Sequence, residues 1–501
     1  MRELVRLGSL LLALVLLGAA APVRAQTRLS PREAVAIALR ENPSLAAAIA
    51  GLRRAQWAVV GENAAFTIPT LQIDVAGQHS ESPAFQGDRL TSAGIDLLSV
   101  GGRLSQRLRL GTDLALRVEH TERWEDRRRN VSLFATGPVY DTSARLELTQ
   151  PFWRGSGREV VQAALLQARA AATEAEAAAE RTASQIIRDV LVAWWQLWLA
   201  EETLRIEEEA LDLARRQRDE AQRKVELGAA APVSVLTFET RVAEREESVA
   251  SALRQRRERA LALAAQLGTV EREVAAGEPS WAPVEIPDPE TARRLAVERA
   301  PEVREAEAAL AAANTRVEPT VDPFRPRLDL QGFAEVGGLS SIYAGFEGNP
   351  FAWVAGVNLI FETPLGTTRY RAAASQARLA VQEADRRLAQ ARLMAESGID
   401  AERARLESAQ ERVGLARRTL EVAQAQLRAE QRKYEIGTAT PIEVLQAEEA
   451  VRTARLRLAT AEVELRSAEA AIEHLTGRLV ERWAGELLAA QSAVAGPDPS
   501  R

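Results

Sequence analysis

The chain contains no cysteine among its 501 residues. This absence excludes a disulfide-stabilised scaffold, thiolate metal sites, a cysteine nucleophile and a lipid attached through an N-terminal cysteine. Histidine is almost as scarce, because His79, His120 and His474 are the only three. They lie too far apart in sequence to form a zinc motif or a local acid–base pair, and only the tertiary structure decides whether they meet. We therefore predict no metal site and no cofactor.

Aromatic residues are also few, at 5% of the chain. The length alone would correspond to about three domains of ordinary size, yet so few large side chains suit a long, thin molecule better than three compact cores. The formal net charge is −6, and no window gathers basic residues beside aromatic side chains. Nucleic acid is therefore not a predicted partner.

Long apolar runs are limited to the N-terminus, where Leu7–Pro22 follows two arginines and precedes Val23-Arg24-Ala25. This order predicts a secretory signal peptide over residues 1–25, removed before Gln26. A permanent anchor is the less favoured alternative, because the run falls short of the roughly 20 residues that a spanning helix needs. The mature chain is then either soluble outside the cytoplasm or inserted in a membrane as a β-barrel.

The clearest feature that is present is an internal repeat. Lys224–Gly228 matches Lys433–Gly437, and the offset of 437 minus 228, or 209, also relates Gln167-Ala168-Arg169 to Gln376-Ala377-Arg378. An ungapped tandem duplication places similar surfaces in two copies, and duplications of this kind build arrays or rings.

Each copy has the same order of parts: a helical segment, an extended region, a very long helix, a short Gly-containing turn and a second helix. The expected boundaries are a signal peptide at 1–25; a first repeat at 26–268, with strands within 69–151, a long helix at 158–227, a turn at 228–232 and a helix at 233–268; a linker at 269–288; a second repeat at 289–477, with strands within 327–363, a long helix at 367–436, a turn at 437–441 and a helix at 442–477; and a tail at 478–501. A helix of about 70 residues would be roughly 105 Å long. Such helices must line up with one another in a bundle or tube.

Heptad spacing supports a bundle of helices. Apolar residues alternate steps of three and four in the last helix and in the long helix before it: Val444, Ala447, Val451, Ala454, Leu458, Ala461, Leu465, Ala468, Ile472 and Leu475, and Leu406, Ala409, Val413, Ala416, Leu420, Ala423 and Leu427. Alanine alternating with larger residues lets helices approach closely. An ordinary secreted coiled coil would show the same periodicity.

The extended regions favour a different class of protein. Leu71–Val75 and Leu114–Val118 alternate apolar and polar residues, and Val354–Phe361 does so less strictly. This pattern is typical of a strand with one lipid-facing and one wet side. Five aromatic residues lie at or near the expected strand ends: Phe152, Trp153, Phe351, Trp353 and Phe361. They suit either a membrane-interface girdle or packing at a strand–helix junction.

Strands in lipid cannot leave an edge unpaired, because no water is present to satisfy the free backbone groups. Two hairpins from one chain are too few to close a barrel, so closure requires several copies of the chain. The first half also carries surplus residues, among which Arg103–His120, with Gly111 at its centre, is typical of a further hairpin. From sequence, this hairpin either adds strands to the barrel or folds outside the membrane.

The chain resembles the TolC-like outer-membrane efflux family. The resemblance rests on Leu29–Leu45, on Leu148-Thr149-Gln150-Pro151 and above all on Tyr434–Leu445, and it covers residues 28–478. It implies a mainly α fold with a small β part: a homotrimer whose twelve-strand transmembrane β-barrel in outer-membrane lipid continues into a long periplasmic α-helical barrel. It also implies a passive exit duct that docks a periplasmic adaptor protein and, through it, an inner-membrane pump.

The resemblance places the two Gly turns at the periplasmic tip. The residues expected to dock the adaptor are Gly228, Pro232, Val235, Leu236, Gly437, Pro441, Val444 and Leu445. In both turns, Gly would end one helix in a left-handed conformation and Pro would open the next. Lys224 and Lys433, the only lysines, lie four residues before these glycines and suit a helix C-terminus.

The resemblance also makes Tyr434 and Glu443 candidates for an aperture gate. The chain departs from the family pattern at Ala439, Gln446 and Ser234, where an arginine and two acids would complete a closure network. Glu443 has a second interpretation, because Thr440-Pro441-Ile442-Glu443 has the form of a capping box.

We expect a channel of a tripartite efflux or type I secretion system. The alternative is a periplasmic coiled-coil adaptor or scaffold without a pore, although an adaptor would have one helical hairpin rather than two at a fixed offset. An enzyme is not predicted, because the plentiful acidic residues lie along charged helix faces.

Overall fold

The computed structural model describes residues 27–86, 89–126, 139–228, 231–269, 274–279, 284–340 and 352–483. The predicted signal peptide lies outside these residues. The chain forms two compact units. Within the described part of the chain, the first, here called the helical unit, draws on residues 27–50, 177–305 and 389–483, and the second, the sheet unit, draws on residues 51–176 and 306–388.

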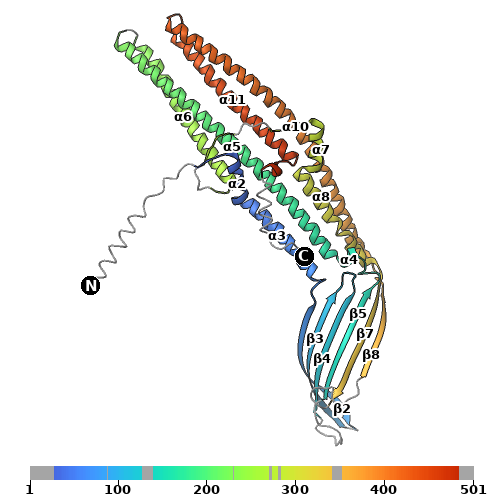
Figure 1. The fold of residues 1–501 in the computed structure, drawn as a ribbon. Helices are drawn as coiled ribbons and strands as arrows, with labels where there is room; N and C mark the ends of the chain where they lie inside the picture. The colour runs from blue at the N-terminus through green and yellow to red at the C-terminus, as the bar shows by residue number, and fades with distance from the viewer. Residues whose placement is uncertain are drawn as a thin grey trace, which may run out of the picture. The chain divides into compact units, whose positions relative to one another are not determined.

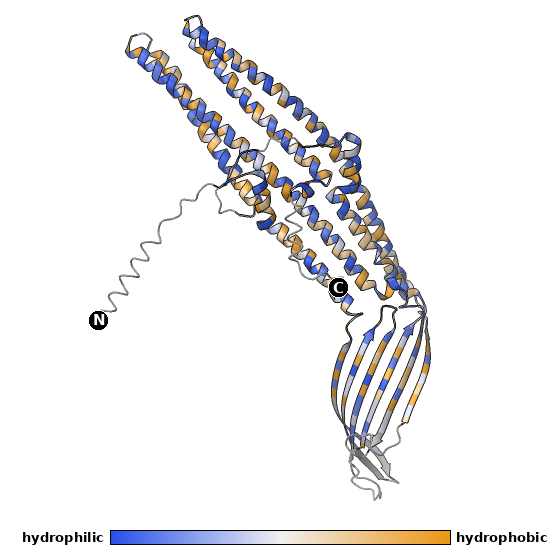
Figure 2. Ribbon diagram, in the orientation of Figure 1, coloured by the Kyte–Doolittle hydropathy of each residue, from blue (hydrophilic) through white to orange (hydrophobic). Residues whose placement is uncertain are grey.

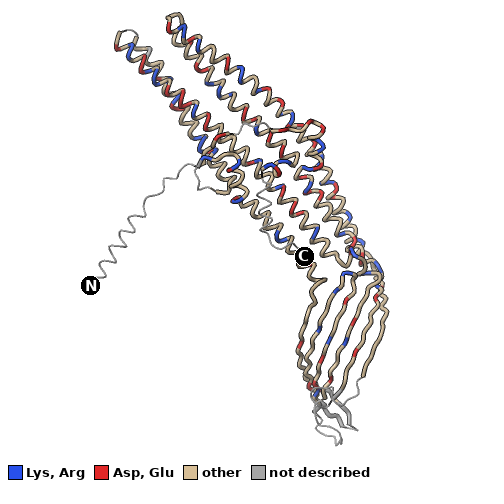
Figure 3. The backbone as a smooth tube through the Cα atoms, in the orientation of Figure 1, with Lys and Arg blue, Asp and Glu red and all other residues tan. Residues whose placement is uncertain are grey.

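Two long helical hairpins make up most of the helical unit (Figure 1). In the first repeat α5 (Ala163–Glu226) is followed by α6 (Val233–Gln266), and in the second α10 (Thr368–Glu435) is followed by α11 (Pro441–Leu475). Alanine, arginine and glutamate have high helix propensity, and no proline interrupts α5 or α10, so both helices run without a break. Basic and acidic residues are interspersed along both hairpins (Figure 3).

The predicted heptad seam between α10 and α11 is confirmed at most of its positions. Ala423, Val451 and Ala454 form a buried cluster, against which Leu420 and Leu427 pack. α11 is also buried on a second side that the heptad pattern did not predict, where it carries Glu448, Val463, Glu469 and Ala470. This helix therefore contacts more than its own hairpin partner.

Shorter elements surround the middle of the hairpins. They are α2 (Pro31–Glu41), α7 (Pro289–Arg299) and the parallel strand pair β1 (Thr27–Leu29) and β6 (Val274–Ala276). The expected linker at 269–288 therefore contains a strand, and all three residues of β6 are buried. Composition alone gave no sign of it, because three residues are too few to show a period.

A tryptophan cluster forms the centre of the main core in the helical unit. Trp194 is fully buried and donates its Nε1–H to the carbonyl oxygen of Leu29 at 2.6 Å, which ties β1 to α5. The Trp194 and Trp195 rings meet edge to face at 4.9 Å, a favourable geometry for aromatic pairs. Trp198 and Trp483 pack against the same core, so four of the nine tryptophans gather there, which the sequence interpretation did not predict.

The repeat has a structural counterpart in two equivalent joints. Gly268, after α6, has φ +84° and lies against the carbonyl of Glu41 at the end of α2. Gly477, after α11, has φ +71° and lies against the carbonyl of Arg299 at the end of α7. α3 (Pro43–Ala64) and α8 (Pro301–Asn314) begin directly after these joints. The end of each hairpin thereby packs against the residues where the chain bends, just before the proline that begins α3 or α8.

The sheet unit contains one antiparallel sheet of six strands in the order β2-β3-β4-β5-β7-β8. Their bounds are β2 Thr70–Gln86, β3 Arg89–Arg107, β4 Asp113–Asp126, β5 Val139–Pro151, β7 Arg327–Ser340 and β8 Ala352–Glu362. The short segments α4 (Arg158–Val161), α9 (Val317–Val321) and the 3-10 turn η1 (Asp322–Phe324) complete this unit. Among the described residues, no helix is both long and apolar enough to cross a membrane.

The surplus hairpin of the first half joins this sheet. It corresponds to the facing ends of β3 and β4, with the turn at Gly111, whose φ is +90°. A twelve-strand barrel from three chains would need four strands from each chain, and the described sheet has six. The two extra strands arise from residues that the second repeat lacks.

The two joints generate a stability prediction. A Cβ at Gly477 would lie 2.5 Å from the Arg299 carbonyl oxygen, and the backbone there is left-handed, so we expect Gly477→Ala to lower the free energy of unfolding by about 2 kcal/mol or more. Gly61→Ala is the control, because an added Cβ would meet nothing within 4 Å in α3. It should be neutral or stabilising by about 0.5–1 kcal/mol. Thermal unfolding followed by circular dichroism in detergent measures both, and equal losses would contradict the joint.

Candidate functional site

The turns at the free ends of the two hairpins have the predicted glycine geometry. Gly228 has φ +72° and Gly437 has φ +76°. Thr440 and Glu443 form the predicted capping box, in which Glu443 Oε2 accepts from the Thr440 backbone N–H at 2.6 Å. These hydrogen bonds lower the pKa of the Glu443 carboxyl. Glu443 is therefore engaged in capping the start of α11, which is the second of its two predicted interpretations.

The first turn has no equivalent cap. Pro232 occupies the N-cap position of α6 without a side-chain hydrogen bond, and Ala231 stands where the second repeat has Thr440. Residues 229–230 of this turn lie outside the described residues. The two hairpin ends therefore share their glycines and prolines but differ in how their second helix begins.

The exposed apolar residues at these ends differ from the predicted docking set. Gly228, Pro232, Leu236, Gly437 and Pro441 are exposed, and Val235 and Leu445 are half-buried. Val444, however, is buried in the α10–α11 seam and presents little surface. Apolar residues immediately beside the turns are the most exposed: Leu227, Val233, Ile436 and Ile442. The sequence interpretation missed them, although a large apolar residue next to an exposed turn is itself an indication of a contact surface.

Lys224 connects the ends of the two hairpins. Its ammonium group donates to the Tyr434 hydroxyl at 3.1 Å, lies 5.5 Å from the centre of that ring, and pairs with Glu220 at 2.8 Å. The Glu220 and Tyr434 hydrogen bonds raise the pKa of Lys224. Lys433, in contrast, pairs within its own helix with Glu430. Position at a helix C-terminus explains Lys433, but it does not account for the contact that Lys224 makes with the second repeat.

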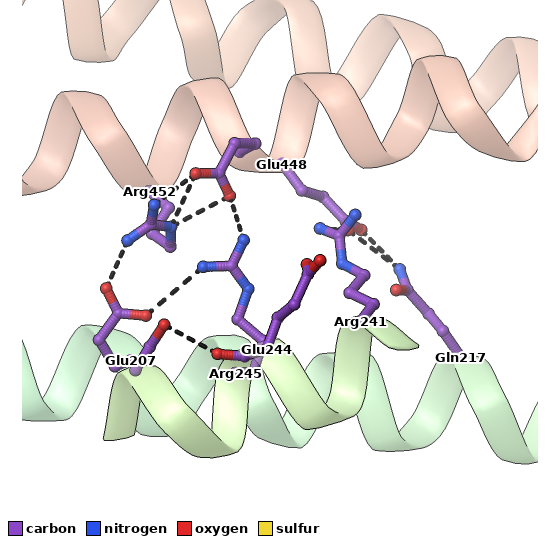
Figure 4. A network of polar contacts seen from close by, with 9 residues as sticks. Glu207, Gln217, Arg241, Glu244, Arg245, Glu448 and Arg452 are labelled. Carbon is purple, nitrogen blue, oxygen red and sulfur yellow. Dashed lines mark hydrogen bonds and ion pairs between the residues drawn. The ribbon is translucent and has the colours of Figure 1, made fainter. Parts of the chain in front are cut away.

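A balanced charge network joins the same hairpins farther from their ends (Figure 4). Glu207 of α5 pairs with Arg452 of α11 and, at 3.6 Å, with Arg245 of α6. Arg245 also pairs with Glu449 at 2.6 Å. On the next turn Glu448 accepts from Gln217 at 3.0 Å and lies 3.7 Å from Arg241. These three glutamates balance the three arginines, and Glu244, which is also labelled in Figure 4, is exposed to solvent, so burial leaves no net charge uncompensated.

The pKa values of two adjacent glutamates in this network are shifted in opposite directions. Burial raises the pKa of Glu448 above its ordinary value of 4.5, more than its contacts with Gln217 and Arg241 lower it. The hydrogen bonds from Arg452 lower the pKa of Glu449, with Arg245 contributing in the same direction. The difference follows from geometry, because Glu449 faces two guanidinium groups and Glu448 lies deeper.

A second buried polar group has the composition of a catalytic triad. Ser184 Oγ lies 2.7 Å from His474 Nδ1, and His474 Nε2 lies 3.3 Å from Glu302 Oε1. Ser184 and His474 are 1% and 3% exposed, so no substrate can reach the hydroxyl. The three residues instead tie α5, α8 and α11 together. In the described part of the chain no cluster of potential metal ligands is found.

Hydrophilic and hydrophobic colours alternate along the strands (Figure 2). One face of the sheet is apolar over the rows that contain Leu71 and Ile73, and farther along the strands the same face also carries His79, Asp96, His120 and Glu122. The strand register places the apolar residues in continuous rows, for example Leu71, Leu104, Leu116, Leu146, Ala334 and Ala355. On the opposite face Arg103, Arg117 and Arg145 lie in one row. Arg145 pairs with Glu147 at 2.9 Å and with Glu335 at 3.5 Å.

The predicted interface aromatics lie at the ends of this apolar face. Trp353 and Phe361 stand on it at opposite ends of β8, eight residues apart and thus about 26 Å along the strand. Trp153 meets Phe361 edge to face at 6.2 Å, and both remain about half exposed, as does Phe152. Phe351 lies outside the described residues. The same aromatic side chains therefore pack at the strand end and remain partly exposed, so the two interpretations offered by the sequence do not exclude each other.

The opposite shifts of Glu448 and Glu449 generate a pH prediction. A raised folded-state pKa means that stability is lost as pH rises through it, so Glu448→Gln should remove a decline of stability above pH 4.5. A lowered pKa means that stability is lost as pH falls below 4.5, so Glu449→Gln should remove part of the acid decline. Denaturant midpoints measured from about pH 3 to pH 7 test both, and identical pH profiles for the two variants would contradict the geometry.

Comparison with known proteins agrees with this architecture. Residues 292–478 match the outer membrane efflux protein family. No curated protein sequence matches the chain significantly. Among solved structures, VceC of Vibrio cholerae is 19% identical with a TM-score of 0.61, covering 89% of this chain and 96% of its own.

Two further structures are similar. CmeC of Campylobacter jejuni is 13% identical with a TM-score of 0.65, covering 93% of this chain and 89% of its own. MtrE of Neisseria gonorrhoeae is 20% identical with a TM-score of 0.60, covering 90% of this chain and 89% of its own. At these identities the structural likeness establishes the TolC-like fold. Together with the match of residues 292–478, it shows that the second repeat is similar to the outer membrane efflux protein family and that the chain shares the fold of outer-membrane channels.

Proposed function

We propose that three copies of the chain form one conduit, through which solutes leave passively across the periplasm and the outer membrane. The conduit serves a tripartite efflux or type I secretion system. In this conduit the sheet unit closes into a barrel in outer-membrane lipid, and the paired helical hairpins form a tube in the periplasm. No bond is made or broken in the solute, and directionality comes from the pump to which the conduit is coupled.

The observation that carries this proposal is the amphipathic sheet with two open edges. Large apolar side chains such as Ile73, Val357 and Leu359 are at least two-thirds exposed on one face. In water such a surface would be unfavourable and prone to aggregation, whereas lipid accommodates it at no cost. The open edges are satisfied by pairing with further copies of the same chain.

The tip of the helical hairpins is the proposed docking surface for a periplasmic adaptor, which links the channel indirectly to an inner-membrane pump. The rigid glycine turns present the predicted residues Gly228, Pro232, Leu236, Gly437 and Pro441. The exposed residues Leu227, Val233, Ile436 and Ile442 extend this surface. Val235, Leu445 and the buried Val444 support the turns from within.

Closure of the tip is proposed to rest on Tyr434. Because Ala439, Gln446 and Ser234 remove the partners of a family-type closure network, the contact of Tyr434 with Lys224 takes their place in holding the two hairpins together. Glu443 contributes indirectly, since its capping box fixes where α11 begins.

A periplasmic adaptor or scaffold without a pore is the competing function. Such a protein would also bind its partners through the coiled-coil hairpins, but its whole surface would be in contact with water. The exposed apolar face of the sheet unit, bounded by Trp353 and Phe361, is difficult to reconcile with that environment. CmeC and MtrE, which share the fold, are both outer membrane channels.

Purification from membranes tests the conduit directly. We expect the protein to resist extraction with high salt, to require detergent, to run as a trimer in native mass spectrometry, and to conduct ions in planar lipid bilayers. A monomer that washes off with salt and shows no conductance would support the scaffold instead.

The tip assignment makes a separate prediction. In Gly437→Val a β-branched side chain would occupy a position with φ +76°, so the turn should be strained and adaptor binding should weaken by tenfold or more. Trimer formation should survive, because the heptad seams are unchanged. Gly414→Ala is the matched control, since it lies within α10 with open space at its Cβ. Pull-down of the adaptor and native mass spectrometry measure the two effects, and loss of trimers with adaptor binding intact would refute the assignment.

A further inference from the structure

The directions of the strands allow the sheets of neighbouring copies to join. All neighbouring pairs in the sheet are antiparallel, so strand direction alternates from β2 to β8 across the six strands. The edge strands β2 and β8 therefore run in opposite directions. When β8 of one copy meets β2 of the next, the pair is antiparallel again and the pattern continues without a fault. An even number of strands per chain is what makes this head-to-tail closure possible.

The hairpin of β3 and β4 has the same character as the strands on either side of it. Leu98, Val100 and Leu104 of β3 lie on the apolar face. Leu104 is in register with Leu71 of β2 and Leu116 of β4, and Val100 is in register with Val75 of β2, whereas β4 places His120 opposite Val100 and Glu122 opposite Leu98. The side chains of Leu98, Val100 and Leu104 are more than one-third exposed, like those of β2 and β5. In a hairpin that folds in water outside the membrane, such a row of exposed apolar side chains would be unfavourable.

The lengths of the strands also indicate that β3 and β4 belong to the barrel. The shortest of the six strands, β8, has 11 residues, and β3 and β4 have 19 and 14. A tilted strand needs about 9–11 residues to cross the hydrocarbon core of a bilayer. All six strands are therefore long enough to cross, including the two that the second repeat lacks.

We propose that the barrel of this protein has eighteen strands, six from each of three copies, instead of the twelve that the family resemblance implies. Six strands are fewer than the eight of the smallest outer-membrane barrels, so one chain cannot close alone. The partner that completes each edge is a second copy of this chain, with β8 against β2. The number eighteen rests on the proposed trimer, whereas the contribution of six strands per chain rests on the sheet itself.

The extra strands widen the barrel of the conduit. Barrel diameter grows roughly in proportion to strand number, so eighteen strands give a barrel about half as wide again as twelve, in the range where natural barrels hold an aqueous channel. The row of Arg103, Arg117 and Arg145, interspersed with Glu119, Glu147 and Glu335, would then line a wet lumen. A bulky or hydrated solute passes such an opening more readily than a narrow one.

Cysteine cross-linking tests whether β8 of one copy meets β2 of the next. Because the chain has no native cysteine, only the introduced cysteines can form disulfides. Ile73 of β2 and Val357 of β8 are both about 70% exposed on the apolar face, at opposite edges of the sheet. Oxidation of full-length Ile73→Cys/Val357→Cys, with Leu71→Cys, Val75→Cys and Leu359→Cys to scan the register, should give covalent trimers for at least one pair. Ile73→Cys/Val118→Cys is the control, since β4 is an inner strand and should not cross-link between chains.

The outcomes separate this inference from the proposed function. Covalent rings of two chains would mean twelve strands from a dimer and would overturn both. Trimers in which Ile73→Cys instead cross-links Leu146→Cys of β5 within one chain would show only four strands per chain, overturning the inference and leaving the conduit intact. Monomers throughout would refute the conduit and, with it, the eighteen-strand barrel.

Access to the lumen provides a second measurement, which the state of the periplasmic tip does not affect. Thr149→Cys lies on the polar face near the end of β5, and maleimide-polyethylene glycol of graded mass is added from outside intact cells. The full chain should admit larger polymers than a variant with residues 89–126 deleted, which retains four strands. Equal size limits in two variants that both insert would contradict the wider barrel, and failure of the deletion variant to insert leaves the cross-linking result to decide.

Discussion

The unsatisfied backbone groups at the two edges of the sheet are the constraint on which the rest of the molecule depends. In an apolar medium a free N–H or C=O costs several kcal/mol, and β2 and β8 each present a whole row of them. The chain cannot satisfy these groups alone, because six strands do not close. In the proposed assembly, neighbouring copies satisfy these edges, so the stability of the subunit, with its helical hairpins, joints and charge network, depends on its neighbours.

The features that could be predicted from sequence are those whose signal is local or repeated. The seam through Val451 and Ala454 shows its own period, and the turn glycines Gly228 and Gly437 are related by a fixed offset. The capping box at Thr440 is readable because it spans only four residues. Strand alternation identified the sheet but not its membership, since pairing of β3 and β4 with β2 and β5 is decided by closure over long stretches of chain.

What escaped prediction depends on segments that meet only in the folded chain. β6 is too short to have a pattern, and the Trp194 bond to Leu29 links residues separated by 165 positions. The burial of Val444, the Lys224–Tyr434 contact and the Glu207–Arg452 pair likewise require knowing which helix faces which. A buried pair of this kind adds little net stability over an apolar contact, but it disfavours any sliding of α11 along α5, because an uncompensated charge would result.

The unequal helix caps at the two turns have a consequence for motion. Where Thr440 and Glu443 close the first turn of α11, the backbone amides there are held, and fraying is suppressed. Where α6 begins at Pro232 without a side-chain cap, the first turn has fewer restraints and should open more often. A threefold assembly would then carry six ends of alternating stiffness around its rim. The three capped ends would be rigid and the three uncapped ends would open more readily. A single duplicated sequence would thus provide both a rigid and a mobile part of the same surface.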